Sequence, residues 1–142
     1  MEPLVIKRVL PCGKRQLFDA WSQASVMSQW FFAQQNCKLP STVNNSFTVG
    51  GDYEVIMHME TGDHRHYGTY RVISRYSHIA FTWNSHIVKD SLVELDFREL
   101  STNRTEMTLT HTLFPDDDVR SMHAAGWEGC LGNLIRLLDR SA

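Results

Sequence analysis

The sequence has few of the features that mark specialised classes of protein. Its 142 residues include only three cysteines, and neither their odd number nor their spacing fits a disulfide framework or a CxxC site. No apolar run reaches the roughly 18 residues that a membrane-spanning helix needs. The first ten residues mix proline with charged residues, unlike a secretory signal. These absences predict a cytoplasmic protein that does not engage a membrane.

The charge balance has no strong sign either. Fourteen Lys and Arg stand against 16 Asp and Glu, which gives a net charge of −2, and Lys14-Arg15 is the densest basic pair. Because nucleic-acid binding normally needs a clustered cationic surface, no nucleic-acid partner is expected. The composition is that of an ordinary globular protein. A chain of this length can bury one core without metal or disulfides, so we expect a single domain over residues 1–142.

The first third of the chain predicts a strand, two short helices and a loop. Pro11 and Gly13 end the strand, and the helices are separated by a polar break. Proline and paired asparagines indicate the loop. In chain order we expect a strand over Leu4–Leu10, helices over Gln16–Trp21 and Val26–Phe32 with Ser25 as the N-cap of the second, a loop over Lys38–Ser46, and a short strand over Phe47–Val49.

From Asp52 to Phe114 the apolar residues recur with a period of two, which is typical of half-buried strands. Gly62-Asp63 offers a two-residue hairpin turn. Since cross-strand partners share a face, this turn would continue the apolar face of the first strand onto the second. The predicted pairs are Tyr53 with Val72, Val55 with Tyr70, Met57 with Gly68, and Met59 with His66.

The same parity argument extends the inner face over the later strands. A turn around Arg75-Tyr76 places Phe81 opposite Tyr70 and Trp83 opposite Gly68, and a turn around Thr102 joins two more strands. The predicted pairs there are Val93 with His111, Leu95 with Leu109, and Phe97 with Met107. His66 and His111 therefore both belong to the inner face.

The end of the chain predicts a long amphipathic helix. Residues 115–118 supply a turn, a cap and acidic groups that suit a helix N-terminus. At about 100° per residue, one stripe collects the apolar residues and His123. The stripe consists of Val119, His123, Gly126, Trp127, Cys130, Leu134 and Leu137. We therefore predict an α+β fold, with a curved antiparallel sheet of about six to seven strands around the long C-terminal helix.

Seven short motifs then resemble those of a known superfamily, in the same order and over nearly the whole chain. They are Phe18-Asp19-Ala20-Trp21, Trp30-Phe31, Gly50-Gly51-Asp52-Tyr53, Gly68-Thr69-Tyr70, Phe81-Thr82-Trp83, Leu109-Thr110-His111, and Gly126-Trp127 with Leu131. The chain is similar to the START-like (SRPBCC) superfamily, and within it to the branch named after the C-terminal domain of the activator of the 90-kDa heat-shock protein ATPase. This resemblance implies a helix-grip fold with a cavity between sheet and helix.

Three histidines are the most informative polar residues of the inner face. His66, His111 and His123 could bind zinc if all three converged on one point, but the favoured interpretation is that each is a buried imidazole bonded to a Tyr, a Thr or water. A third interpretation is that His111 and His123, with Tyr70, orient a ligand or act as acid and base. His64 is placed at the turn edge. No nucleophile motif is present, and we expect no metal or other cofactor.

The leading hypothesis is a protein that encloses a small apolar or aromatic molecule. Gly68 and Gly126 lie on inward faces, where each would mark either a close backbone approach or open space. The predicted ligand-binding residues are Trp30, Phe32, Tyr53, Val55, Met57, His66, Tyr70, Phe81, Trp83, Phe97, Leu109, His111, His123, Gly126 and Trp127. The alternatives are a cyclase-, dehydratase- or hydrolase-like enzyme and, by the resemblance, a partner of the chaperone. The resemblance also allows a homodimer, which no sequence feature decides.

Overall fold

The computed structural model describes residues 2–31 and 37–140 and forms one seven-stranded antiparallel sheet with three helices. The order of elements agrees with the predicted α+β arrangement. In chain order they are β1 (Leu4–Leu10), α1 (Lys14–Ser22), α2 (Ala24–Trp30), β2 (Cys37–Asn45), β3 (Asp52–Met59), β4 (Gly62–Ser74), β5 (His78–Trp83), β6 (Ser91–Ser101), β7 (Arg104–Thr112) and α3 (Asp117–Arg140).

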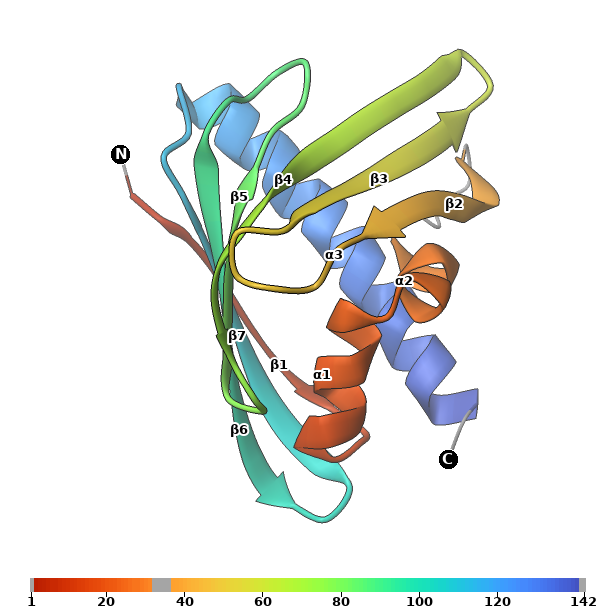
Figure 1. The fold of residues 1–142 in the computed structure, drawn as a ribbon, viewed down its shortest axis with the longest axis vertical. Helices are drawn as coiled ribbons and strands as arrows, with labels where there is room; N and C mark the ends of the chain where they lie inside the picture. Colours follow the sequence, from red (N-terminus) through yellow and green to blue (C-terminus); the bar gives the residue numbers. More distant parts are fainter. Residues whose placement is uncertain (1, 32–36, 141–142) are drawn as a thin grey trace.

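The sheet curves around α3, which lies across one of its faces (Figure 1). The strand order is β1-β7-β6-β5-β4-β3-β2, so the first strand pairs with the last and forms one edge. Alternate residues of β6 and β7 are buried, as a sheet with one covered face requires. This is the helix-grip fold that the family resemblance implied.

The predicted register is confirmed where the inner face crosses β5, β6 and β7. Tyr70 pairs with Phe81, and Val93 pairs with His111. The β3–β4 register was wrong by four residues, because the turn is Glu60-Thr61 and Met59 pairs with Gly62. Gly62 has a φ of 132°, which glycine tolerates at the end of the turn. A shift by an even number of residues keeps every side chain on its face, so the inner face survives the error.

The segment predicted as a loop is instead the edge strand β2, and Phe47–Val49 is a turn rather than a strand. Pro40 misled the prediction, because proline is tolerated on edge strands and at bulges. The pairing of β2 with β3 shifts between Lys38 and Thr42, on either side of that proline. Phe47 packs edge-on against Tyr70 at a centroid distance of 4.8 Å, so the turn still contributes to the core.

Both short helices exist, but the predicted cap of the second was wrong. Gln23 ends α1 and also precedes α2, and no side chain caps it. Ser25 lies inside α2, because a single residue separates the two helices and leaves no place for a later cap. At the start of α3 the prediction holds, since the backbone N–H of Val119 donates to the Asp116 carboxylate at 2.9 Å.

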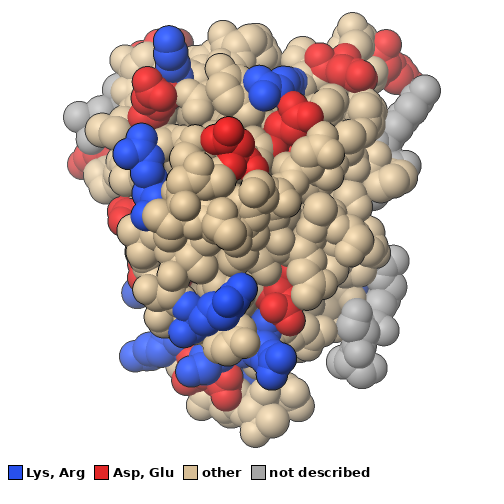
Figure 2. All heavy atoms as spheres, in the orientation of Figure 1, with Lys and Arg blue, Asp and Glu red and all other residues tan. Residues whose placement is uncertain are grey.

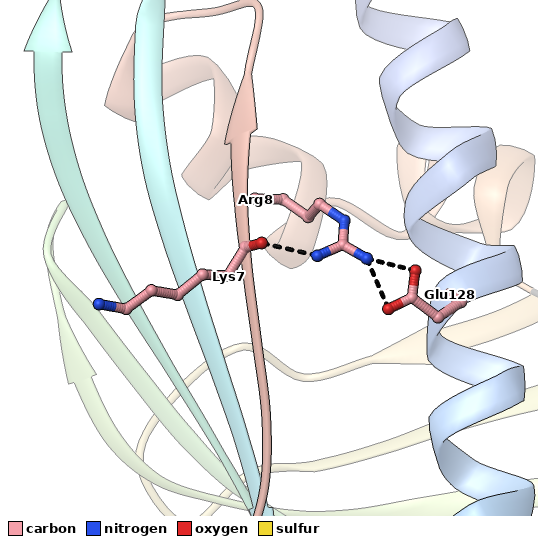
Figure 3. A network of polar contacts seen from close by, with 3 residues as sticks. All are labelled: Lys7, Arg8 and Glu128. Atoms are coloured by element: carbon pink, nitrogen blue, oxygen red, sulfur yellow. Dashed lines mark hydrogen bonds and ion pairs between the residues drawn. The ribbon is translucent and has the colours of Figure 1, made fainter.

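The long helix is also fastened to the edge strand β1 by polar contacts. Arg8 donates to both carboxylate oxygens of Glu128 and to the backbone oxygen of Lys7, the latter at 2.7 Å (Figure 3). Arg120 donates to the backbone oxygens of Glu2 and Pro3, each at 3.1 Å. These contacts hold the first strand and the last helix together from two points along the helix.

The molecular surface shows no continuous basic face in the view of Figure 2. Lys and Arg gather toward the end of the molecule where the β6–β7 turn and the start of α1 lie, but acidic groups are interspersed among them. Within the described part of the chain, no helix is both long enough and apolar enough to cross a membrane.

A candidate ligand-binding pocket

A pocket of about 510 Å³ opens between the β3–β4 hairpin, the segment after β5 and the N-terminal half of α3. Apolar, sulfur-containing and imidazole side chains form its wall, and no Asp, Glu, Lys or Arg of the described residues lines it. The lining residues are Met57, Met59, His64, His66, Trp83, Ser85, His86, Ile87, Met122, His123, Ala125, Gly126, Trp127 and Cys130.

The helix keeps the pocket open at Gly126. A Cβ placed on this residue would meet no atom within 4 Å, so a larger side chain here would project into empty volume. Gly68 has the opposite role, because a Cβ there would lie 1.9 Å from the backbone oxygen of Thr82. Of the two inward glycines, Gly126 therefore marks open space and Gly68 marks a close backbone approach.

The deep wall of the pocket is aromatic and the rim is flexible. The rings of Trp83 and Trp127 lie 5.0 Å apart at 50°, and both side chains are buried. At the rim, Met122 is 58% exposed. Methionine adapts its shape to what it contacts, so the wall combines a rigid aromatic floor with an adjustable entrance.

Two buried histidines face the pocket in neutral form. His66 packs against Trp83 at a ring distance of 5.1 Å, and burial followed by the nearby His123 lowers the pKa of His66 to about 4. His123 Nδ1 donates to the backbone oxygen of Val119 at 2.8 Å, and burial lowers its pKa as well. Near pH 7 both imidazoles are therefore uncharged polar groups in an apolar wall.

His111 is fully buried and its polar atoms are already used. The indole N–H of Trp127 donates to His111 Nδ1 at 3.1 Å, so the proton sits on Nε2 and is donated to Ser91 Oγ at 2.8 Å. The Ser91 hydroxyl in turn donates to the backbone oxygen of Trp83 at 2.6 Å. Burial first, and then His123, lower the pKa of His111 to about 3. This chain of bonds holds Trp83 and Trp127 in the wall of the pocket.

The structure separates the predicted ligand-binding residues into two groups. Those that line the pocket are Met57, His66, Trp83, His123, Gly126 and Trp127. Those that lie in the surrounding core instead are Trp30, Tyr53, Val55, Tyr70, Phe81, Phe97, Leu109 and His111. Phe32 lies outside the described residues. Sequence periodicity identifies an inward face, but it does not distinguish side chains that meet neighbours from those that meet open volume.

Several lining residues were missed by the sequence reasoning. Placing His64 at the turn edge was wrong, because the four-residue register shift sets it directly opposite Met57. The segment after β5 has no regular hydrophobic period from which inward positions could be predicted. It contributes Ser85, His86 and Ile87 to the lining. Met59 and Ala125 adjoin predicted positions, and the alternation of β3 could have identified Met59.

The arrangement that acid–base catalysis by Tyr70, His111 and His123 would need is not formed. Only His123 lines the pocket, whereas the Tyr70 hydroxyl donates to Asn45 Oδ1 at 2.7 Å within the core. Over the described residues, no group of three or more His, Cys, Asp or Glu side chains could hold a metal ion. These three groups therefore do not meet at the pocket.

Comparison with known proteins decides the family. The model of the family described as "Activator of Hsp90 ATPase homolog 1-like protein" matches residues 12–139. The chain belongs to this family. A search of curated proteins finds no match to the sequence. Most of the described chain, including every residue that lines the pocket, falls within the matched range.

Several solved structures share the fold of this chain. The AHSA1 protein from Silicibacter pomeroyi is 20% identical with a TM-score of 0.85, and the match covers 99% of this chain and 100% of that one. A protein from Chromobacterium violaceum is 18% identical with a TM-score of 0.85, over 97% and 98%. An HSP90 activator from Plasmodium falciparum is 19% identical with a TM-score of 0.79, over 98% and 97%.

Proposed function

We propose that this protein binds a small, uncharged apolar or aromatic molecule in the pocket between the β3–β4 hairpin and α3. The observation that carries the proposal is an open volume of about 510 Å³ whose described lining contains no formally charged residue. Pockets for small molecules usually occupy about 300–1,000 Å³ and combine apolar walls with a few polar groups. The size and the lining both fit that description.

The chemistry of the wall suggests how such a molecule would lie. Its ring system would pack against Trp83 and Trp127, where offset and edge-on aromatic contacts are favourable. The neutral imidazoles of His66 and His123 both face the pocket. Because His123 donates through Nδ1 to the backbone oxygen of Val119, its Nε2 can accept a hydrogen bond from a ligand hydroxyl group. An ionised ligand would find no permanent counter-charge in the described wall, so an uncharged molecule is favoured.

Filling the pocket is expected to abolish binding without harming the fold. The change is Gly126→Leu, which directs a side chain into empty volume and replaces a poor helix former by a good one. With the neutral aromatic probe N-phenyl-1-naphthylamine, we expect saturable fluorescence enhancement with the unaltered protein. We expect at least tenfold weaker binding with the variant.

The matched control is Gly132→Leu on the same helix. A Cβ at Gly132 would meet only the end of the flexible Arg136 side chain at 3.6 Å, and the residue does not line the pocket. Probe affinity should therefore stay unchanged in this variant. Equal affinities of both variants and the unaltered protein would contradict the proposal, as would native mass spectrometry that finds the probe bound elsewhere.

A second candidate function is stimulation of the ATPase of an Hsp90 chaperone, which the family match and the fold shared with an HSP90 activator favour. We expect the protein in molar excess to raise the ATP hydrolysis rate of Hsp90 from the same organism severalfold in a coupled assay. Gly126→Leu should stimulate equally, since it alters only the pocket. An unchanged rate would rule this candidate out.

Both proposed functions are compatible with the cytoplasmic location expected from the sequence. The homodimer that the family resemblance allows stays a prediction.

A further inference from the structure

The mouth of the pocket brings together two histidines whose nitrogen atoms are not otherwise used. The rings of His64 and His86 lie 5.2 Å apart at an angle of 36°, and both line the pocket. Neither ring has a hydrogen-bond partner among the described residues, unlike His58, His111 and His123. His64 is half-buried and His86 is exposed, so an ion from solvent could reach both.

The separation of the two rings fits a shared metal ion. A metal bound at about 2.0–2.1 Å from an imidazole nitrogen lies about 3.2 Å from the ring centre. Two rings that share it at a near-tetrahedral angle have centres about 5 Å apart. The observed 5.2 Å agrees with this value.

Thioethers stand beside these imidazoles on the same face of the hairpin. Met57 pairs directly with His64, and directly opposed residues have Cβ atoms about 5 Å apart. Met59 pairs with Gly62 and is thus the diagonal neighbour of His64. Both methionines line the pocket. Their unbranched, flexible side chains allow a sulfur atom to approach the point that the two rings share.

The donor set selects the kind of metal. The described lining offers imidazole nitrogen, thioether sulfur and the buried thiol of Cys130 but no carboxylate, and among the described residues no three His, Cys, Asp or Glu side chains form a metal site. Thioethers favour copper(I), whereas oxygen ligands suit magnesium, calcium and manganese. We propose that His64, His86 and Met57 bind one copper(I) ion at the mouth of the pocket. This site does not depend on the binding of an organic molecule against Trp83 and Trp127.

Anaerobic competition with the chromophoric chelator bicinchoninate tests the proposal. We expect the protein to withdraw one equivalent of copper(I) from the chelator. His64→Gln and His86→Gln should each weaken the affinity at least tenfold, and Met57→Leu, which preserves the side-chain volume, should weaken it severalfold. The matched control is His58→Gln, because His58 lies on β3 but is bonded to Thr42 and Asp63 outside the pocket. Its affinity should equal that of the unaltered protein.

Three results would overturn the copper(I) site. The first is the absence of copper(I) transfer from the chelator. The second is loss of binding in Cys130→Ser with no change in His64→Gln, because the ion would then be bound by a thiol. The third is zinc(II) binding of equal strength that shows the same dependence on His64 and His86. Circular dichroism of each variant confirms that the fold is intact, so a lost site is distinguished from a lost fold.

Discussion

Replacing Gly68 by alanine is expected to destabilise the protein by roughly 3–5 kcal/mol, at the upper end of single-substitution effects. The added Cβ would lie 1.9 Å from the backbone oxygen of Thr82 and 2.7 Å from its carbonyl carbon. That oxygen cannot move aside easily, because the Tyr53 hydroxyl donates to it at 2.6 Å. The Tyr67–Asn84 bridge also holds the two strands together next to Gly68.

Urea unfolding measures this effect, and Gly126→Ala is the matched control. The alanine at position 126 meets no atom within 4 Å, and alanine is favoured over glycine inside a helix by about 1 kcal/mol. The two substitutions, identical in chemistry, should therefore shift the unfolding midpoint in opposite directions. Similar shifts in both variants would show that the close approach at Gly68 is not a constraint on the fold.

Acidification is expected to remove several kcal/mol of stability as the pH falls from about 6.5 toward 3. Burial lowers the pKa of His66 from 6.5 to about 4 and that of His111 to about 3, so in the folded protein each stays neutral until the pH approaches its own pKa, whereas the unfolded chain takes up protons near pH 6.5. Where the unfolded state binds more protons, stability rises with pH. At about 1.4 kcal/mol per pKa unit, His66 alone contributes roughly 3 kcal/mol.

Urea unfolding at pH 7, 5.5 and 4 reports this loss. Carboxylate protonation adds to it at the acidic end, so the histidine part is isolated with His66→Gln, which should flatten the pH dependence. His58→Gln changes an imidazole on the other face of the hairpin, bonded to Thr42 and Asp63, and serves as the comparison. Identical pH profiles for the two variants would show that the buried imidazole of His66 is not responsible.

Most of the fold followed from side-chain alternation, because the period of two survives errors in the turn. The β3–β4 turn was misplaced at Gly62-Asp63, yet Tyr53 and His66 still share the inner face since the shift was even. The strand Cys37–Asn45 could not be recognised, because an edge strand tolerates Pro40 and because the buried position at Ser41 carries a polar side chain.

The pocket was less accessible to prediction than the face that it occupies. His111 and Trp83 are both inward and both buried, but only Trp83 borders open volume. The open volume next to Trp83 exists because Gly126 of the covering helix α3 has no side chain, and because the irregular segment that carries His86 forms another part of the wall. Neither can be derived from a local pattern, since both arise from how distant elements approach one another.

The pairing of the first strand with the last has a consequence for biosynthesis. Leu4 pairs with His111, Arg8 of β1 is bonded to Glu128 of α3, and Arg120 of α3 holds the residues just before β1. That helix ends only at Arg140. Contacts so distant along the chain form late and slow folding. During translation, the apolar face of the sheet that α3 covers in the folded protein would therefore stay exposed until the helix has left the ribosome. The nascent chain would most need protection from aggregation during that interval.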